Sequence, residues 1–125
     1  MAKKPLDTMT ESMFYTMLAL SCGPRCGIDI AQDIRRLTDK RIILGSGTLY
    51  TILSKFLEVG YIRQVDLDGR KRTYEITDKG IGALNDELSR LRQCLSDAVH
   101  IHELEKEKTY GKQDSEDSDP ALCPV

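Results

Sequence analysis

The stretch that most constrains the fold is a predicted β-hairpin at residues 61–77, YIRQVDLDGRKRTYEIT. Apolar residues alternate with polar ones on both sides of an Asp68-Gly69 pair: Val65 and Leu67 before it, Tyr74 and Ile76 after it. An Asp-Gly pair between two alternating runs is a strong short-range signal for a tight hairpin turn. The other patterns in the chain are helical, so the sequence predicts a mostly α protein with one small β-hairpin.

A first helix is predicted from near Met9 to Cys22, because Thr8 and Glu11 have the spacing of a capping box and Gly23-Pro24 follows the apolar run. Basic residues before this run resemble the start of a targeting signal, but two acidic residues interrupt the pattern. The run is also far too short to span a membrane. We therefore expect a buried first helix and a cytoplasmic protein.

A second helix is predicted from Gly27 to about Thr38. Its apolar side is formed by Ile30, Ala31, Ile34 and Leu37. Residues 40–44 are predicted to form a short strand, after which a loop leads into the next helix.

The third helix, predicted from residue 46 until Gly60 ends it, has two contrasting faces. Its apolar stripe has the width that faces a core and consists of Leu49, Ile52, Leu53, Phe56 and Leu57. The opposite face carries short hydroxyl side chains, one tyrosine and one cation: Ser46, Thr48, Tyr50, Thr51, Ser54 and Lys55. A merely solvated face would usually contain more Glu and Lys, so this face is suited to close contact with another molecule.

The last helical pattern is a leucine-rich stripe with coiled-coil spacing: Ile81, Leu84, Leu88, Leu91, Leu95 and Ala98. Thr77-Asp78 is predicted to cap this helix, which would be about 45 Å long if it reached Lys108. We expect its first turns, Ile81 to Leu88, to pack on the first helix. So small a domain cannot cover the rest, so Leu91, Leu95 and Ala98 are predicted to contact a second copy of the chain.

Charge is unevenly distributed in the 125-residue chain, whose net charge is −2. All 18 Lys and Arg residues precede residue 113, and the densest basic cluster is Arg70, Lys71 and Arg72 at the hairpin tip. Residues 113–125 hold only acidic charges. The sequence therefore predicts three parts: residues 1–77, a helix at 78–108, and an acidic, disordered tail at 109–125.

Catalytic or metal chemistry finds little support in the sequence. There is no Gly-rich phosphate loop and no nucleophile elbow. Cys22 and Cys26 have no second cysteine pair to complete a zinc site, and His100 and His102 lie far from them in the sequence. We expect free thiols, no metal, no cofactor and no enzymatic activity.

Three helices followed by a basic-tipped hairpin is the element order of a winged helix-turn-helix. In that architecture the third helix enters the major groove of DNA and the hairpin, called the wing, reaches phosphates or a neighbouring groove. The short hydroxyl side chains of the third helix allow a close approach to base edges, whereas acidic residues there would be repelled by phosphate. The predicted DNA contacts are Ser46, Thr48, Tyr50, Thr51, Ser54 and Lys55 on the helix and Arg70, Lys71 and Arg72 on the wing.

The chain resembles the PadR-type transcriptional regulators, in the short subgroup with a single C-terminal helix. Three motifs carry the resemblance: LALSCGPRCGIDI at 18–30, GTLYTILSKFLEVGYI at 47–62 and GRKRTYEITDKG at 69–80. Cys26 and Ile28 depart from the His and Tyr that are usual in the family. The acidic tail has no counterpart in the resemblance.

The resemblance implies a dimeric repressor that binds a roughly palindromic DNA operator and is released by a small molecule or a stress signal. The main alternative is a winged-helix module that binds another protein and has no specific DNA site. Three consecutive cations in the wing favour DNA over that alternative. A MarR-like regulator is disfavoured, because such chains place further helices before the DNA-binding unit.

Overall fold

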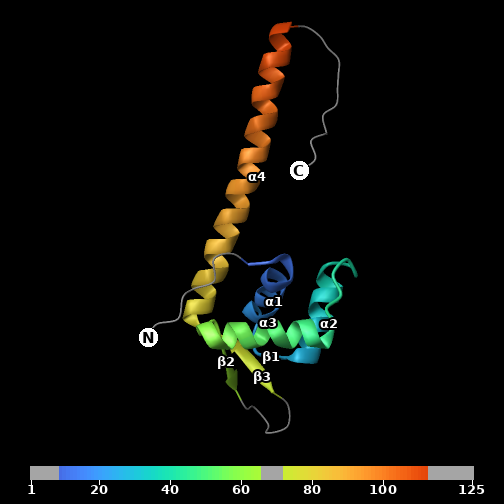
Figure 1. Cartoon of the computed structure of the whole chain (residues 1–125), viewed down its shortest axis with the longest axis vertical. Coiled ribbons are helices and arrows are strands. Elements are labelled where there is room, and N and C mark those ends of the chain that lie inside the picture. Colours follow the sequence, from blue (N-terminus) through green and yellow to red (C-terminus); the bar gives the residue numbers. More distant parts are fainter. Residues whose placement is uncertain (1–8, 66–71, 113–125) are drawn as a thin grey trace. The chain divides into compact units, whose positions relative to one another are not determined.

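The computed structural model describes residues 9–65 and 72–112, with side chains up to residue 106. Its elements are α1 (Glu11–Ser21), β1 (Arg25–Cys26), α2 (Gly27–Leu37), α3 (Ser46–Val59), β2 (Ile62–Val65), β3 (Thr73–Ile76) and α4 (Asp78–Lys112). The chain divides into two compact units, residues 1–87 and 88–125, and α4 belongs to both. In the first unit α1, α2 and α3 pack together and a small sheet lies at one side of them (Figure 1), which confirms the predicted mostly α fold.

Thr10 caps the first helix in place of the predicted Thr8. The hydroxyl oxygen of Thr10 accepts a hydrogen bond from the backbone N–H of Met13 at 3.1 Å. The capping-box prediction is wrong because Thr10 directly precedes the first turn, so Glu11 becomes the first helical residue. An acidic side chain there is favourable because the N-terminus of a helix carries partial positive charge.

The turn after α2 is built from left-handed backbone. Asp39 and Lys40 have positive φ angles of 51° and 67°. The backbone N–H of Lys40 donates to the Arg35 carbonyl at 2.7 Å, and that of Asp39 donates to the Arg36 carbonyl at 3.2 Å. This pair of bonds is a Schellman cap, which ends the helix and redirects the chain. The strand predicted at residues 40–44 is therefore wrong, because this segment forms the turn and the loop before α3.

The sheet has three antiparallel strands in the order β1-β3-β2. The predicted hairpin is confirmed in β2 and β3, with Ile62 opposite Ile76 and Val65 opposite Thr73. Its Asp68-Gly69 turn lies outside the described residues. Strand β1 was not predicted, since a two-residue strand is too short to show alternation, yet it pairs with β3 and joins the start of α2 to the wing.

The core of the first unit lies among α1, α2 and α3. Its most deeply buried apolar side chains are Met17, Leu20, Ile30, Ile34, Leu53 and Phe56. Two residues that the sequence placed in apolar stripes are exposed instead, Leu37 by 60% and Leu57 by 37%. Both lie at the edge of their stripe, where helical spacing does not reveal whether another element covers the side chain.

Thr77 joins the start of α4 to the end of α3. Its hydroxyl donates to the Gly60 carbonyl at 2.6 Å and accepts from the Gly80 backbone N–H at 3.1 Å. The predicted cap at Thr77 is thus confirmed. Gly60 has the left-handed φ of 83° that is typical of a glycine ending a helix, as predicted for α3.

Gly80 sets the rotation of the first turns of α4. A Cβ atom on Gly80 would collide with the carbonyl oxygen of Tyr61, so only glycine fits this inward position. Its neighbour Ile81 therefore points outward and is 43% exposed, while Leu84 is 6% exposed. The prediction that Ile81 packs into the first unit is wrong, and Leu84 is the leucine that is buried there.

In the second unit α4 continues to Lys112, past the predicted end at Lys108. No glycine or proline interrupts the sequence between Gly82 and Gly111, so the helix has no earlier stop signal. Large apolar side chains are exposed along this segment of the single chain: Leu91, Leu95, Val99, Ile101 and Leu104. The rest of the predicted tail, residues 113–125, lies outside the described residues.

Candidate nucleic-acid interface

The outer face of α3 is the exposed polar surface that the sequence predicted. Leu49, Ile52, Leu53 and Phe56 are buried and fix the rotation of this helix. The exposed residues opposite them are Ser46, Thr48, Tyr50, Thr51, Ser54 and Lys55. No acidic residue precedes Glu58 in α3, so the first three turns present hydroxyl groups and one cation.

The first turn of α3 has almost no bulk on its outer side. Gly47 is exposed, and a Cβ atom added to it would meet no other atom within 4 Å. The Thr51 hydroxyl donates to the Gly47 carbonyl at 2.9 Å, which holds this side chain along the helix. Its oxygen lone pairs remain available to accept from a bound molecule. The backbone of this turn can therefore approach a partner surface closely.

Tyr50 reaches from α3 to the start of α2. Its hydroxyl lies where a side chain on Gly27 would begin, since a Cβ there would be 2.6 Å from that oxygen. An open hollow of about 390 Å³ surrounds this contact and is lined by Cys26, Gly27, Ile28, Tyr50 and Arg72. The hollow thus brings together Tyr50 of α3 and Arg72 of the wing, both predicted to contact DNA. It also includes Cys26 and Ile28, the two positions that differ from the usual family residues. The sequence did not indicate that these residues meet.

The wing begins and ends in the paired strands β2 and β3. Arg72 directly precedes β3 and is exposed, whereas Arg70 and Lys71 lie outside the described residues. Across the strands, Arg63 donates from both Nε and Nη2 to one carboxylate oxygen of Glu75, at 2.9 and 2.6 Å. Arg63 is therefore held by an acid within the sheet, while Arg72 faces the hollow beside Tyr50.

Several arginines of the first unit are neutralised by acidic partners. Arg25 and Arg36 share the carboxylate of Asp33, at 3.0 and 2.7 Å. Arg41 binds Glu11 at 2.9 Å and donates to the Tyr15 hydroxyl at 3.0 Å. These hydrogen bonds, that of Glu11 first, raise the pKa of Arg41 above its already high ordinary value, so it remains a cation at any physiological pH.

Other cations of the first unit have no such partner among the residues that the structure describes. They are Arg35, Lys40, Lys55, Arg72 and Lys79. Lys55 and Arg72 were predicted to bind DNA. Arg35 and Lys40 were not predicted to bind DNA.

The described residues include no group of three or more His, Cys, Asp or Glu that could hold a metal ion. Cys22, Cys26 and Cys94 are free thiols, and Cys123 lies outside the described part. Within that part, no helix is both long enough and apolar enough to cross a membrane.

The fold defines the chain as a winged helix-turn-helix protein with a C-terminal helix. Residues 17–86, more than half of the chain, match the model of the transcriptional regulator PadR-like family. The chain therefore belongs to this family of transcriptional regulators, as the sequence motifs predicted.

Solved structures of transcriptional regulators share the fold of this chain. A transcriptional regulator from Clostridium thermocellum is 23% identical, with a TM-score of 0.63 over 70% of this chain and 89% of that one. A PadR family regulator from Clostridium difficile R20291 is 17% identical, with a TM-score of 0.63 over 71% and 95% of the two chains. The regulator BldR from Sulfolobus solfataricus is 20% identical, with a TM-score of 0.60 over 74% and 62%. The comparison with curated proteins finds no match.

Proposed function

We propose that this chain is a sequence-specific, double-stranded-DNA-binding regulator that acts as a dimeric repressor. The observation that carries the proposal is the outer face of α3, which is exposed, rich in hydroxyl groups and free of acids before Glu58. Such a face fits the major groove, where hydroxyls can bond base edges and phosphates. Lys55 on the same face and Arg72 at the wing are cations without an acidic partner among the described residues.

In this proposal the three parts of the chain have separate tasks. Residues 1–77 bind DNA, with Ser46, Thr48, Tyr50, Thr51, Ser54 and Lys55 in the major groove and Arg70, Lys71 and Arg72 at phosphates or a neighbouring groove. The helix at 78–108 pairs with a second copy through Leu91, Leu95 and Ala98. Two-fold symmetry then places the two α3 helices about 34–36 Å apart on a roughly palindromic operator. A small molecule or stress signal releases the dimer from DNA.

The first test is a selection of bound genomic fragments, followed by titration of a selected fragment and of unrelated DNA at several salt concentrations. We expect native protein to bind the selected fragment at least about a thousandfold more tightly than unrelated DNA, as specific regulators do. Arg72→Ala should weaken binding to both DNAs and make the salt dependence shallower, by about 0.9 in slope per lost phosphate contact. Thr51→Val, which replaces the hydroxyl by a methyl group of similar size, should weaken binding to the selected fragment more than to unrelated DNA.

Lys79→Ala is the matched control, since Lys79 is an exposed cation at the start of α4 whose side chain lies beside Gly60, at the opposite end of α3 from Ser46 and Thr48. It should leave both affinities nearly unchanged. If folded native protein enriches no genomic fragment, the proposal is wrong. The alternative, a winged-helix module that binds another protein, would then be favoured.

A further inference from the structure

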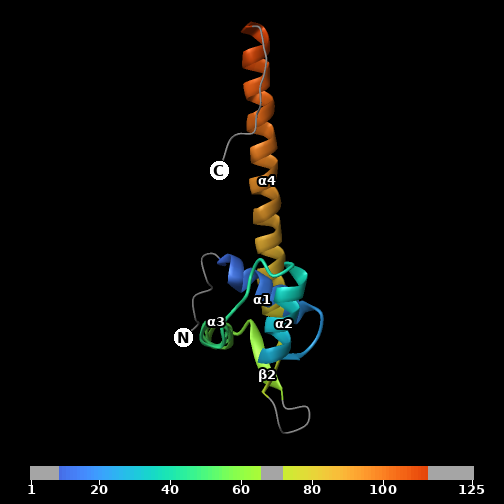
Figure 2. The same cartoon turned by 90° about the vertical axis from the view of Figure 1, so that its right-hand side faces the viewer.

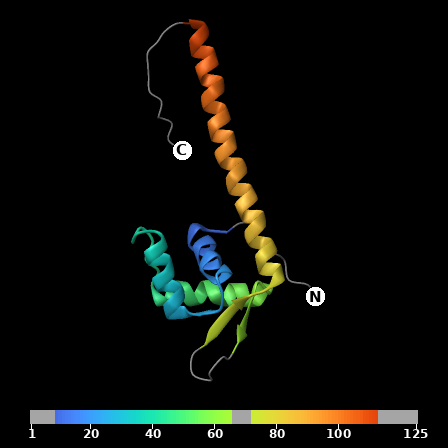
Figure 3. The same ribbon diagram turned by 180° about the vertical axis from the view of Figure 1, so that it is seen from behind.

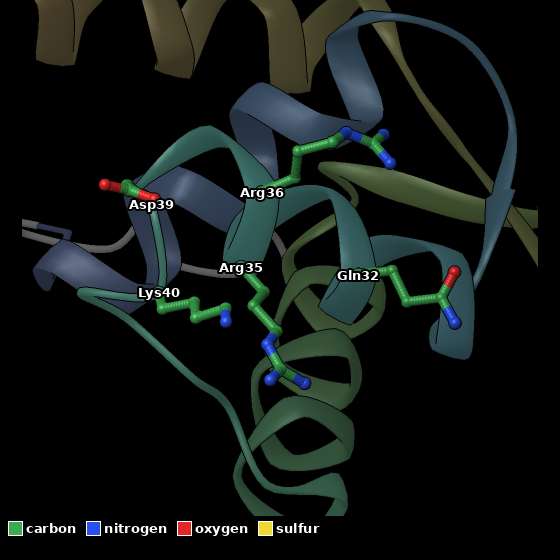
Figure 4. A pocket seen from close by; sticks show the side chains of 5 residues that line it. All are labelled: Gln32, Arg35, Arg36, Asp39 and Lys40. Atoms are coloured by element: carbon green, nitrogen blue, oxygen red, sulfur yellow. The ribbon is translucent and has the colours of Figure 1, made fainter.

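Arg35 and Lys40 form a cationic pair beside the loop that leads into α3. Together with Gln32, Arg36 and Asp39 they line an open hollow of about 290 Å³ at the end of α2. Figure 4 shows Arg35 and Lys40 projecting in the same direction, whereas Arg36 projects to the opposite side of the helix. That difference agrees with the ion pairs, because Arg36 binds Asp33 while Arg35 and Lys40 have no acidic partner among the described residues.

The backbone holds Lys40 in a conformation that glycine would adopt more easily. Its φ of 67° lies in the left-handed region, which is unfavourable for a residue with a side chain. The Schellman bond from Lys40 to the Arg35 carbonyl enforces this geometry. Thr38 reinforces it, since its hydroxyl donates to the Ile34 carbonyl at 2.8 Å and accepts from the Ile42 N–H at 3.1 Å. A non-glycine residue whose backbone is held in this conformation points to a role for its side chain.

The position of this pair relative to α3 suggests what that role is. In Figures 1, 2 and 3 strands β2 and β3 extend below α3, and the end of α2 with its following turn lies above it. Figure 2, which looks along α3, shows both on the same lateral side of this helix. The major groove is about 12 Å wide and is bordered by a phosphate backbone on each side. If α3 lies in the major groove and the wing reaches the phosphates at one border of that groove, the side of α3 opposite the wing faces the phosphates at the other border.

We infer that Arg35 and Lys40 bind DNA phosphates at the border of the major groove opposite the wing. This inference rests on the proposed function and adds a second set of phosphate contacts to it. The two cations converge on one hollow, so a single phosphate or two adjacent ones can occupy it. With contacts at both borders, the DNA would hold α3 in a defined register, as phosphate contacts do in DNA-binding proteins.

The experiment compares two double variants that remove the same charge, Arg35→Gln/Lys40→Gln and Arg36→Gln/Lys79→Gln, in titrations of a selected DNA fragment at several salt concentrations. The first should make the salt slope shallower by about 1.8–3.6, which corresponds to one or two contacts in each subunit at about 0.9 each. The second should leave the slope unchanged, because Arg36 also lines the hollow but its guanidinium is held by Asp33. Arg36 adjoins Arg35 at the same helix end, so it also controls for the effect of charge on the helix C-terminus.

Ethylation of individual phosphates locates the contacts. With native protein, ethylation should interfere on both borders of each major groove, and with Arg35→Gln/Lys40→Gln it should interfere only on the border next to the wing. Lys40→Gly provides an independent variant, because glycine fits the left-handed position. Its thermal midpoint should equal or exceed that of native protein while its DNA affinity falls.

The outcomes separate this inference from the proposed function. If native protein binds its fragment and Arg35→Gln/Lys40→Gln has the native slope and ethylation pattern, the inference is wrong and the proposed function stands. If native protein binds no fragment, both are wrong. If the effect of the double variant disappears once residues 113–125 are deleted, the pair acts through the acidic segment and the inference is overturned.

Discussion

At Gly80 the backbone of α4 lies against the carbonyl oxygen of Tyr61, which also accepts the Thr77 N–H at 2.9 Å. Gly80→Ala should therefore lower the free energy of unfolding by about 1–3 kcal/mol, the usual effect of added bulk in a packed site. Gly82→Ala is the matched control, since Gly82 is also in α4 but a Cβ there meets nothing within 4 Å.

The control should be more stable than native protein by about 0.5–1 kcal/mol, because alanine is the better helix former. Urea denaturation followed by circular dichroism measures both variants. If Gly80→Ala and Gly82→Ala had the same free energy of unfolding, the structure around Tyr61 could accommodate a methyl group at position 80 without loss of stability.

At the scale of the element, the first two turns of α3 combine an exposed glycine, Gly47, with hydroxyl side chains at Thr48 and Thr51. Gly47→Ala adds one methyl group to the outer side, where the chain itself has no neighbouring atom. We expect unchanged or slightly higher thermal stability, because alanine favours a helix.

The same methyl group should obstruct close approach to the groove and weaken binding to a selected fragment about tenfold, or about 1.4 kcal/mol. Thermal unfolding and DNA titration of the same preparation measure the two effects. Native affinity in a folded Gly47→Ala protein would show that this turn does not approach the DNA closely.

At the scale of the whole molecule, the proposed dimer depends on the exposed apolar side chains of α4. Leu95 is 67% exposed in the single chain and follows Leu91 by one helical turn. Leu95→Glu should shift the protein from dimer to monomer in light scattering, because a charge in a helix-pairing seam loses its hydration. The monomer should also bind a palindromic fragment much more weakly, since one half-site replaces two.

Leu104→Glu makes the same change about two and a half turns further on, which places it on the opposite side of the helix from Leu95. Leu104 is 42% exposed, and this variant should remain a dimer. Dissociation by Leu104→Glu but not by Leu95→Glu would move the seam to the other side of α4.

Some structural features of this protein could be predicted from the sequence and others could not. Patterns within one element were reliable: the polar face of α3, the left-handed Gly60 after it, the cap at Thr77 and the paired strands of the wing all follow from local spacing. These features depend on backbone geometry and on contacts between residues a few positions apart, which the order of amino acids determines directly.

Two errors were local, namely the helix cap placed at Thr8 and the strand placed at residues 40–44. The other errors arose where a remote element determines the outcome. Leu37 and Leu57 have the spacing of buried residues, but no neighbouring element covers them, and Ile81 is turned outward because Gly80 meets Tyr61. Strand β1 forms only because β3 offers it a partner.

The sequence by itself determined the order of the four helices and the hairpin, the polar face of α3 and, through its motifs, the family of the chain. Only the tertiary structure decided which cations remain available. Arg25, Arg36, Arg41 and Arg63 are bound by acids. Arg35 and Lys40, beside the start of α3, have no acidic partner in the described part of the chain. The physical reason is that an ion pair requires two side chains within about 4 Å, and that proximity is set by how the elements pack.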